Sequence, residues 1–249
     1  MTMRGLRRSK GFSLIELAIV LVVIGLLVGG GLVALQVATE RDSRSQQQRQ
    51  LADVRDALYG YAVAEGRLPC PADLDDPDGE GVTDGDECTL TTGALPWAEL
   101  GVGHRDAWGD YLLYHVHGRF AAPRPADGGE DGVIFDLTTE TDNADQIMIR
   151  DLDAAPISRR AVAVVVSFGG QGGQVWTGGG FNCPGFDGPA DGFSAEETTN
   201  CDRDSDFVAG GYRDANHEDG RFDDLVIWLP DVILKSRMVE AQRLPEMAP

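Results

Sequence analysis

Leu17–Leu35 reads LAIVLVVIGLLVGGGLVAL, a run of 19 residues without a charged side chain. A helix rises about 1.5 Å per residue, so this run can cross the roughly 30 Å hydrocarbon core of a bilayer. The apolar region of a secretory signal peptide is shorter, ~7–15 residues, and ends at a small-x-small cleavage site. No convincing site of that kind lies around residues 36–39. The stretch therefore predicts a transmembrane helix over residues 12–38.

Charged residues flank this run unequally. The segment before it is basic and holds no acid, with Arg4, Arg7, Arg8 and Lys10. The segment after it mixes both signs, with Glu40, Arg41, Asp42 and Arg44. Because basic residues favour the cytoplasmic side, we expect a single-pass protein with a cytoplasmic N-terminus and the bulk of the chain outside.

Glu16 stands at the cytoplasmic end of the apolar stretch. A carboxylate inside a membrane costs roughly 2.5–3.5 kcal/mol on insertion scales, so Glu16 is a candidate functional residue. The alternative is a side chain in the headgroup zone with no special role. Position alone does not choose between the two.

The string around Glu16, KGFSLIEL over Lys10–Leu17, resembles the class III signal of type IV prepilins and type II secretion pseudopilins. The resemblance implies that a prepilin peptidase cuts after Gly11 and that the new N-terminal Phe12 is methylated. It also implies that Glu16 pairs with the N-terminal amine of a neighbouring subunit. In a filament core of low dielectric, a carboxylate that is costly alone becomes tolerable when paired.

The family architecture divides the chain into four parts. Residues 1–11 would be the leader peptide, 12–38 the transmembrane helix, 39–65 its amphipathic continuation, and 66–249 a periplasmic or extracellular head. The continuation carries apolar side chains at spacings of three and four, namely Leu51, Val54, Leu58, Tyr61 and Ala62. This spacing predicts a helix with one buried face that stops by Gly66.

The head is expected to be α+β, with an antiparallel sheet packed on the second half of the long helix. Strand-like runs lie at residues 111–117, 161–168 and 225–229, and weaker ones at 133–137 and 147–149. A short amphipathic helix is expected at 232–244. Extra loops around residues 71–93, 120–150 and 180–222 make the chain longer than a typical major pseudopilin. This length indicates a minor or specialised subunit.

The charge balance excludes one class of partner. Asp and Glu number 41 against 21 Lys and Arg, which gives a formal charge of -20. Such a surface repels phosphate backbones, so no nucleic acid partner is expected. The resemblance instead implies the membrane, sister pilins or pseudopilins, prepilin peptidase and an inner-membrane assembly platform as partners. It implies an inner-membrane location with a periplasmic head, and then a pilus, pseudopilus or cell surface.

The cysteines Cys70, Cys88, Cys183 and Cys201 form two neighbouring pairs, each 18 positions apart. Four cysteines allow three connectivities. We favour Cys70–Cys88 and Cys183–Cys201, because each bond would close one loop rich in Gly and Asp; four free core thiols are the alternative. Disulfides would place the head in an oxidising compartment.

Two acidic loops are candidate calcium sites. In the first, the template's oxygen-ligand positions are occupied by Asp76, Asp78, Glu80, Val82, Asp84 and Glu87, and its glycine position by Gly81. The second has D-x-D-x-D spacing at Asp202, Asp204 and Asp206, with Phe207 where glycine would stand. Flanking EF-hand helices are missing, so the alternative is solvated acidic turns. Calcium is therefore a possible ligand, and no cofactor is certain.

No catalytic constellation is evident, so the chain is not expected to be an enzyme. His115 and His117 alternate on an expected strand, but no third metal ligand follows from the spacing, and surface or core histidines are the better interpretation. The leading hypothesis is a structural subunit of a type IV pilus or type II secretion pseudopilus. The alternatives are a pilus-displayed adhesin or ligand-binding module, and a membrane-anchored sensor that never polymerises.

Overall fold

The computed structural model describes residues 13–85, 87–121, 133–141, 145–177, 180–184 and 192–244, without the side chains of 26–37. The predicted leader 1–11 and the cleavage residues Gly11 and Phe12 lie outside this part. Internal contacts divide the chain into two units, Met1–Ser43 and Arg44–Pro249. The fold is α+β, with an N-terminal helix followed by a sheet region.

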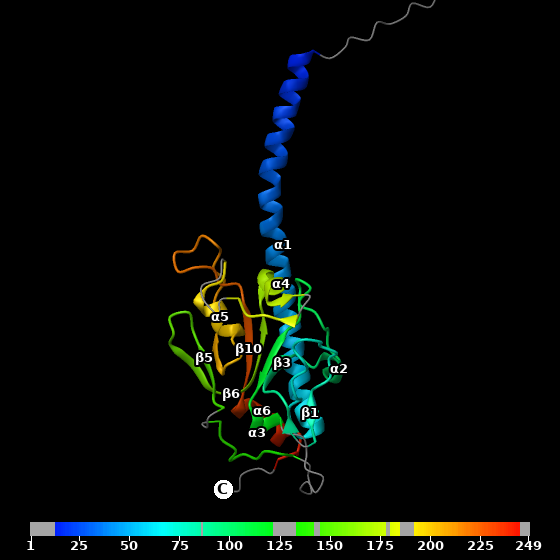
Figure 1. Ribbon diagram of the computed structural model, residues 1–249, viewed down its shortest axis with the longest axis vertical. Helices are drawn as coiled ribbons and strands as arrows, with labels where there is room; N and C mark the ends of the chain where they lie inside the picture. Colours follow the sequence, from blue (N-terminus) through cyan, green and yellow to red (C-terminus); the bar gives the residue numbers. More distant parts are fainter. Residues whose placement is uncertain are drawn as a thin grey trace, which may run out of the picture. The chain divides into compact units, whose positions relative to one another are not determined.

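Helix α1 comprises the 52 residues Leu14–Glu65 and contributes to both units (Figure 1). In the second unit Leu51, Val54, Leu58 and Ala62 are buried, which confirms the predicted apolar face. Tyr59 is buried with them, whereas Tyr61 is half-buried and donates its hydroxyl to Glu99 Oε2 at 2.9 Å.

The helix ends where the sequence predicts. Gly66 adopts φ 76°, a left-handed conformation that favours glycine, and its N–H donates to Ala62 O at 2.8 Å. Pro69 follows three residues later and cannot continue a helix. A local signal therefore fixes this boundary.

A six-stranded sheet forms the centre of the second unit. Its order is β3-β4-β6-β5-β9, with β10 also paired to β6. The strands are β3 (Thr92–Ala94), β4 (Leu113–Val116), β5 (Ile147–Arg150), β6 (Pro156–Ser167), β9 (Asp206–Val208) and β10 (Leu225–Pro230). The long β6 can carry three partners because β4 and β10 flank its second half while β5 pairs with its first half.

The sheet differs from the expectation in two respects. All pairs are antiparallel except β5 with β9, which is parallel. The prediction of a strand at residues 133–137 is wrong: no strand forms there. Phe135 instead packs on Phe120 with ring centroids 4.9 Å apart, and Ile134 N donates to Gly66 O. The segment is apolar because it covers the core.

Both faces of the sheet are buried. Val165 of β6 packs in the cluster that contains the α1 face, while Val164 and Val166 pack in a second cluster with Phe168 and Phe207. Successive strand residues point to opposite faces. A strand covered on both sides therefore shows a continuous apolar run, as residues 161–166 do.

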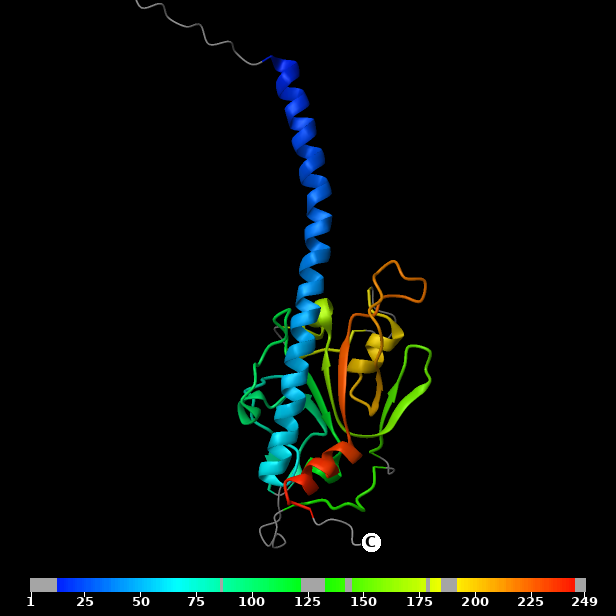
Figure 2. The same cartoon turned by 180° about the vertical axis from the view of Figure 1, so that it is seen from behind.

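Shorter elements connect the strands. They are β1 (Thr83–Asp84), β2 (Glu87–Cys88), β7 (Trp176–Thr177), β8 (Gly180–Phe181), α2 (Trp97–Leu100), α3 (Gly118–Ala121), η1 (Gly169–Gln171), α4 (Gly172–Val175) and α5 (Ala195–Cys201). Helix α6 (Asp231–Glu240) follows β10 directly (Figure 2). Its side chains Leu234 and Met238 are buried. The expected closing helix is therefore present, shifted slightly toward the N-terminus.

The structure joins Cys70 to Cys88 and Cys183 to Cys201, the connectivity favoured from the sequence. The first bond ties the β1–β2 hairpin to the segment that follows α1. The second ties the C-terminus of α5 to the strand β8 region.

Candidate functional site

The first turn of α1 carries Glu16, and Leu17 N donates to Ser13 O at 3.1 Å. Glu16 is exposed. The first N–H groups of a helix lack intrahelical partners, and the helix dipole places partial positive charge there. A carboxylate in this turn is therefore favoured by about 0.3–1 kcal/mol in an exposed setting. It is available to bind a cation from outside the helix.

The same segment exposes apolar side chains on every side. Exposed fractions run from 46% at Val20 to 88% at Leu14. The exposed residues are Leu14, Ile15, Leu17, Ile19, Val20, Leu21, Val22, Val23 and Ile24. At roughly 25 cal/mol per Å² of apolar area, leaving this surface in water is unfavourable. A helix that is apolar all round requires a covering of lipid or of other helices.

No helix in the described part of the chain has both the length and the apolar character that crossing a bilayer requires. The predicted span 12–38 includes Phe12 and the side chains of 26–37, which lie outside that part.

The first predicted calcium loop forms local turns. Asp78 Oδ1 accepts from Glu80 N at 2.9 Å, and Gly81 N donates to Glu99 Oε1 at 2.6 Å. Among the described residues, the acidic side chains of this loop (Asp76, Asp78, Glu80, Asp84 and Glu87) do not form a group of three close enough to hold one ion. Val82 contributes only a carbonyl to the template, and that carbonyl accepts from Thr89 N.

The second predicted loop is a chain of similar turns. Asp202 Oδ1 accepts from Asp204 N, and Asp204 Oδ1 accepts from Asp206 N. Asp206 also pairs with Arg150 at 3.2 Å. Burial, together with the neighbouring carboxylates, raises the pKa of Asp202 to about 6. Calcium at either loop stays a prediction, which calorimetric titration of the chain with calcium would test.

One acidic cluster was not predicted as a set. Glu197, Asp223 and Asp224 are all buried, and each offers an oxygen within 4.8 Å of the others. Glu197 is held by a capping box: it accepts from Ser194 N, and Ser194 Oγ accepts from Glu197 N. Ser-x-x-Glu is a readable signature of a helix start. This signature predicts the N-cap of α5, but it does not predict that Asp223 and Asp224 lie beside Glu197.

Among the described residues, one arginine side chain forms an ion pair with this cluster. Arg221 pairs with Asp223, and Asn200 Nδ2 donates to Asp224 Oδ2 at 2.8 Å. Asp223 Oδ1 is buried without a hydrogen-bond partner among the described residues. Burial raises the pKa of Glu197 to about 7 and raises the pKa of Asp224 well above its ordinary value. Protons therefore offset part of the charge of this cluster near neutral pH.

The two alternating histidines are core residues. His115 and His117 are both buried. His115 Nδ1 lies 2.6 Å from Thr92 Oγ1, and burial lowers the pKa of His115 to about 4. His117 Nδ1 accepts from Arg119 N. Neither histidine joins a group of three potential metal ligands in the described part of the chain.

Comparison with known families gives one match. Residues 6–32 match the model described as the prokaryotic N-terminal methylation motif. This segment contains Gly11, Phe12 and Glu16 together with the exposed apolar part of α1. No curated protein and no solved structure matches the chain.

Proposed function

We propose that this chain, which carries at residues 6–32 the class III signal of type IV pilins and pseudopilins, is a membrane-anchored filament subunit. It polymerises with sister pilins or pseudopilins through its N-terminal helix. The motif points to a structural pilin-like protein and away from an enzyme. The observation that carries the proposal is the motif itself, placed directly before a helix that exposes apolar side chains all round.

Processing would prepare the subunit for assembly. Prepilin peptidase would cut after Gly11, and Phe12 would become the methylated N-terminus. The cut removes all four basic leader residues and leaves a single cationic amine next to the apolar segment. In the low dielectric of packed helices, that amine and the Glu16 carboxylate of a neighbour would stabilise each other. The pairing would set the register of each incoming subunit.

The length of the head supports a minor or specialised position in a type IV pilus or type II secretion pseudopilus. In the described part of the chain its main core cluster extends from Leu51 to Leu244, and its two disulfides suit the periplasm or cell surface. The inner-membrane assembly platform would be a further partner. Before assembly the subunit would span the inner membrane once, with its head in the periplasm.

Mass spectrometry of the mature N-terminus tests the proposal. We expect a chain that begins at Phe12 and carries one methyl group. Gly11→Ala should leave the leader attached, whereas Gly5→Ala in the same leader should be processed normally. An intact Met1 in the wild-type chain, or a cut near residue 38, would contradict the proposed processing.

A further inference from the structure

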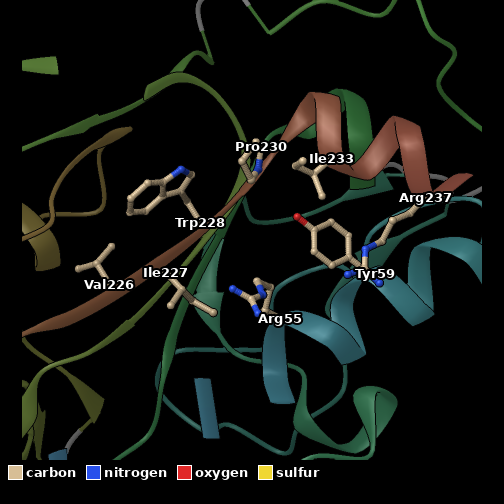
Figure 3. Close-up of a pocket in the computed structure, with 8 residues that line it drawn as sticks. All are labelled: Arg55, Tyr59, Val226, Ile227, Trp228, Pro230, Ile233 and Arg237. Carbon is tan, nitrogen blue, oxygen red and sulfur yellow. The ribbon is translucent and has the colours of Figure 1, made fainter. Parts of the chain in front are cut away.

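A groove runs along the surface where α1, β10 and α6 meet (Figure 3). Its volume is about 380 Å³. It is lined by Arg55, Tyr59, Val226, Ile227, Trp228, Pro230, Ile233 and Arg237. All of these residues belong to the second unit of the chain, so the groove is a feature of the head alone.

The walls of the groove are largely apolar. Val226, Ile227 and Trp228 of β10 are only partly covered, and Ile233 of α6 is 44% exposed. Val232, next to it on α6, is 51% exposed. Apolar side chains gathered in one concave place mark an interaction surface more often than scattered ones do. The groove therefore favours an occupant that supplies some apolar area of its own.

Two arginines give the groove a positive charge. The Arg237 guanidinium lies 4.7 Å from the Tyr59 ring centroid, and Figure 3 shows Arg55 beside the same ring. Among the described residues, Asp56 is the acid that pairs with both, at 3.9 Å from Arg55 and 4.0 Å from Arg237. One carboxylate at those distances leaves the pair cationic. About half of each arginine side chain is exposed, so both can bind a carboxylate from outside.

The chain itself presents a matching acidic loop. Residues 214–219 are all exposed and include Asp214, Glu218 and Asp219. Two backbone hydrogen bonds between Arg213 and Phe222, of 2.8 and 3.1 Å, close the base of this loop. Tyr212 beside it is 49% exposed and adds apolar area. In a chain with a charge of -20, a cationic groove is complementary to the protein's own surface.

The loop lies at the start of strand β10, whereas the α6 end of the groove, with Ile233 and Arg237, lies beyond the end of that strand. Strand β10 begins three residues after Phe222 and leads directly into α6. Six strand residues cover about 20 Å at roughly 3.3 Å per residue. Figures 1 and 2 both show the orange loop segment and the red helix α6 at the two ends of the sheet. A contact of the loop with Ile233 and Arg237 therefore joins two copies, and its head-to-tail repetition builds an open filament where the rotation between copies closes no ring.

We propose that the groove formed by α1, β10 and α6 binds the acidic loop 214–219 of a second copy of this chain. Arg55 and Arg237 bind its carboxylates, while Ile233 and Trp228 contact its apolar atoms. This contact rests on the proposed filament function and specifies how heads follow one another. It is separate from the pairing of Glu16 with a neighbour's N-terminal amine.

Cysteine trapping in the full-length chain tests the contact. A chain carrying both Ala215→Cys and Ile233→Cys should form disulfide-linked multimers in the membrane. Chains carrying only one of these substitutions should not. The matched control pairs Ala215→Cys with Ile157→Cys, an equally exposed apolar position on β6, and should give no multimers. Equal trapping in the test and control pairs would overturn the proposal.

A charge swap gives a second measurement that needs no new cysteine. Arg237→Glu should lower the yield of chemically cross-linked copies about tenfold, as expected when one pair worth about 1.4 kcal/mol is lost. Adding Asp219→Arg to the same chain should restore the yield. Arg159→Glu with Asp153→Arg, both exposed elsewhere on the head, should change nothing. Loss without restoration in the double variant would contradict the pairing.

The N-terminus of the chain is read by mass spectrometry in the same samples. Subunits that begin at Phe12 and enter filaments but show no trapping would overturn this contact and leave the proposed function intact. Unprocessed chains that still show trapping would overturn the proposed function and support the contact. The chain could instead bind vesicles of anionic lipid, depend on Arg237 for this binding and show no trapping between copies. That result would overturn the proposal and make a membrane surface the occupant of the groove.

Discussion

Glu16 is the residue in α1 whose chemistry differs most from its surroundings. It is an exposed carboxylate in the first turn of a helix whose following side chains are apolar. Replacing it should leave the helix and the head intact, because its side chain supports no core contact. It should remove the group that would pair with an incoming amine.

Glu16→Ala is therefore expected to give normal membrane insertion and normal head folding but a large loss of filament incorporation. The measurement is the fraction of subunits recovered in sheared filaments relative to the membrane. Glu65→Ala, at the exposed far end of the same helix, is the matched control and should assemble normally. Normal assembly of Glu16→Ala would favour an anchored protein that does not polymerise.

Glu197 makes the stability of the head depend on pH. Burial raises its pKa from an ordinary 4.5 to about 7, so the folded chain keeps a proton that the unfolded chain releases. The contribution of Glu197 to the free energy of unfolding is then fully present below about pH 4.5, and it is lost as pH rises toward 7. The effect is on the order of 2 kcal/mol.

Glu197→Gln removes this titration. Its melting temperature should match wild type at pH 4 and exceed wild type at pH 8, because the amide stays neutral. Glu196→Gln, at the neighbouring position where the side chain is 26% exposed, should keep the pH dependence of wild type. A melting temperature that falls between pH 4.5 and 7 by the same amount in wild type and in Glu197→Gln would contradict the role of this carboxyl.

At the scale of elements, the disulfides support parts of the fold that have little regular structure. Cys183–Cys201 closes a loop with a sequence separation of 18 and ties α5, which carries Glu197, to the segment after β8. Closing a loop of this size restricts the unfolded chain and stabilises the fold by about 3 kcal/mol.

Replacing Cys183 and Cys201 together by Ala should lower the free energy of unfolding by about 3 kcal/mol. Thermal or denaturant unfolding measures this. Hydrogen exchange should become faster first in α5, because Cys201 anchors that helix through this disulfide. Replacing the partly exposed Thr199 and the exposed Ser236 by Ala controls for two substitutions outside the core and should change stability little.

At the scale of the whole molecule, the head contains its own core. The main hydrophobic cluster begins at Leu51 and includes residues of β4, β6, β10 and α6. Removing residues 1–43 takes away the exposed apolar segment and no member of that cluster. The remaining chain keeps the α1 face that covers the sheet.

A fragment of residues 44–249 should therefore be monodisperse without detergent and should unfold in one cooperative transition with both disulfides formed. A fragment of residues 66–249 is the contrasting control. It lacks Leu51, Val54 and Leu58, whose burial contributes roughly 1.5–3 kcal/mol each. We expect it to bind hydrophobic dyes and to lack a cooperative transition; two equally folded fragments would contradict this account of the core.

Features set by neighbouring residues could be predicted from the sequence. The 6–32 motif, the α1 face from Leu51 to Ala62, the stop at Gly66 and the runs that became β6 and β10 are of this kind. Each depends on spacing along a few turns or strand residues, so the chain order alone determines it. The loop 133–137 shows the limit of prediction from local pattern, because a short apolar run looks the same whether it pairs as a strand or covers a core.

The tertiary structure alone decided the meeting of Glu197 with Asp223 and Asp224, and of Arg55 with Trp228 and Arg237. These residues come from elements distant in the sequence, and their separations follow from how the helices pack on the sheet. The parallel pairing of β5 with β9 was decided in the same way. The physical reason is that local preferences fix elements, whereas the shared burial of their faces fixes which side chains lie together.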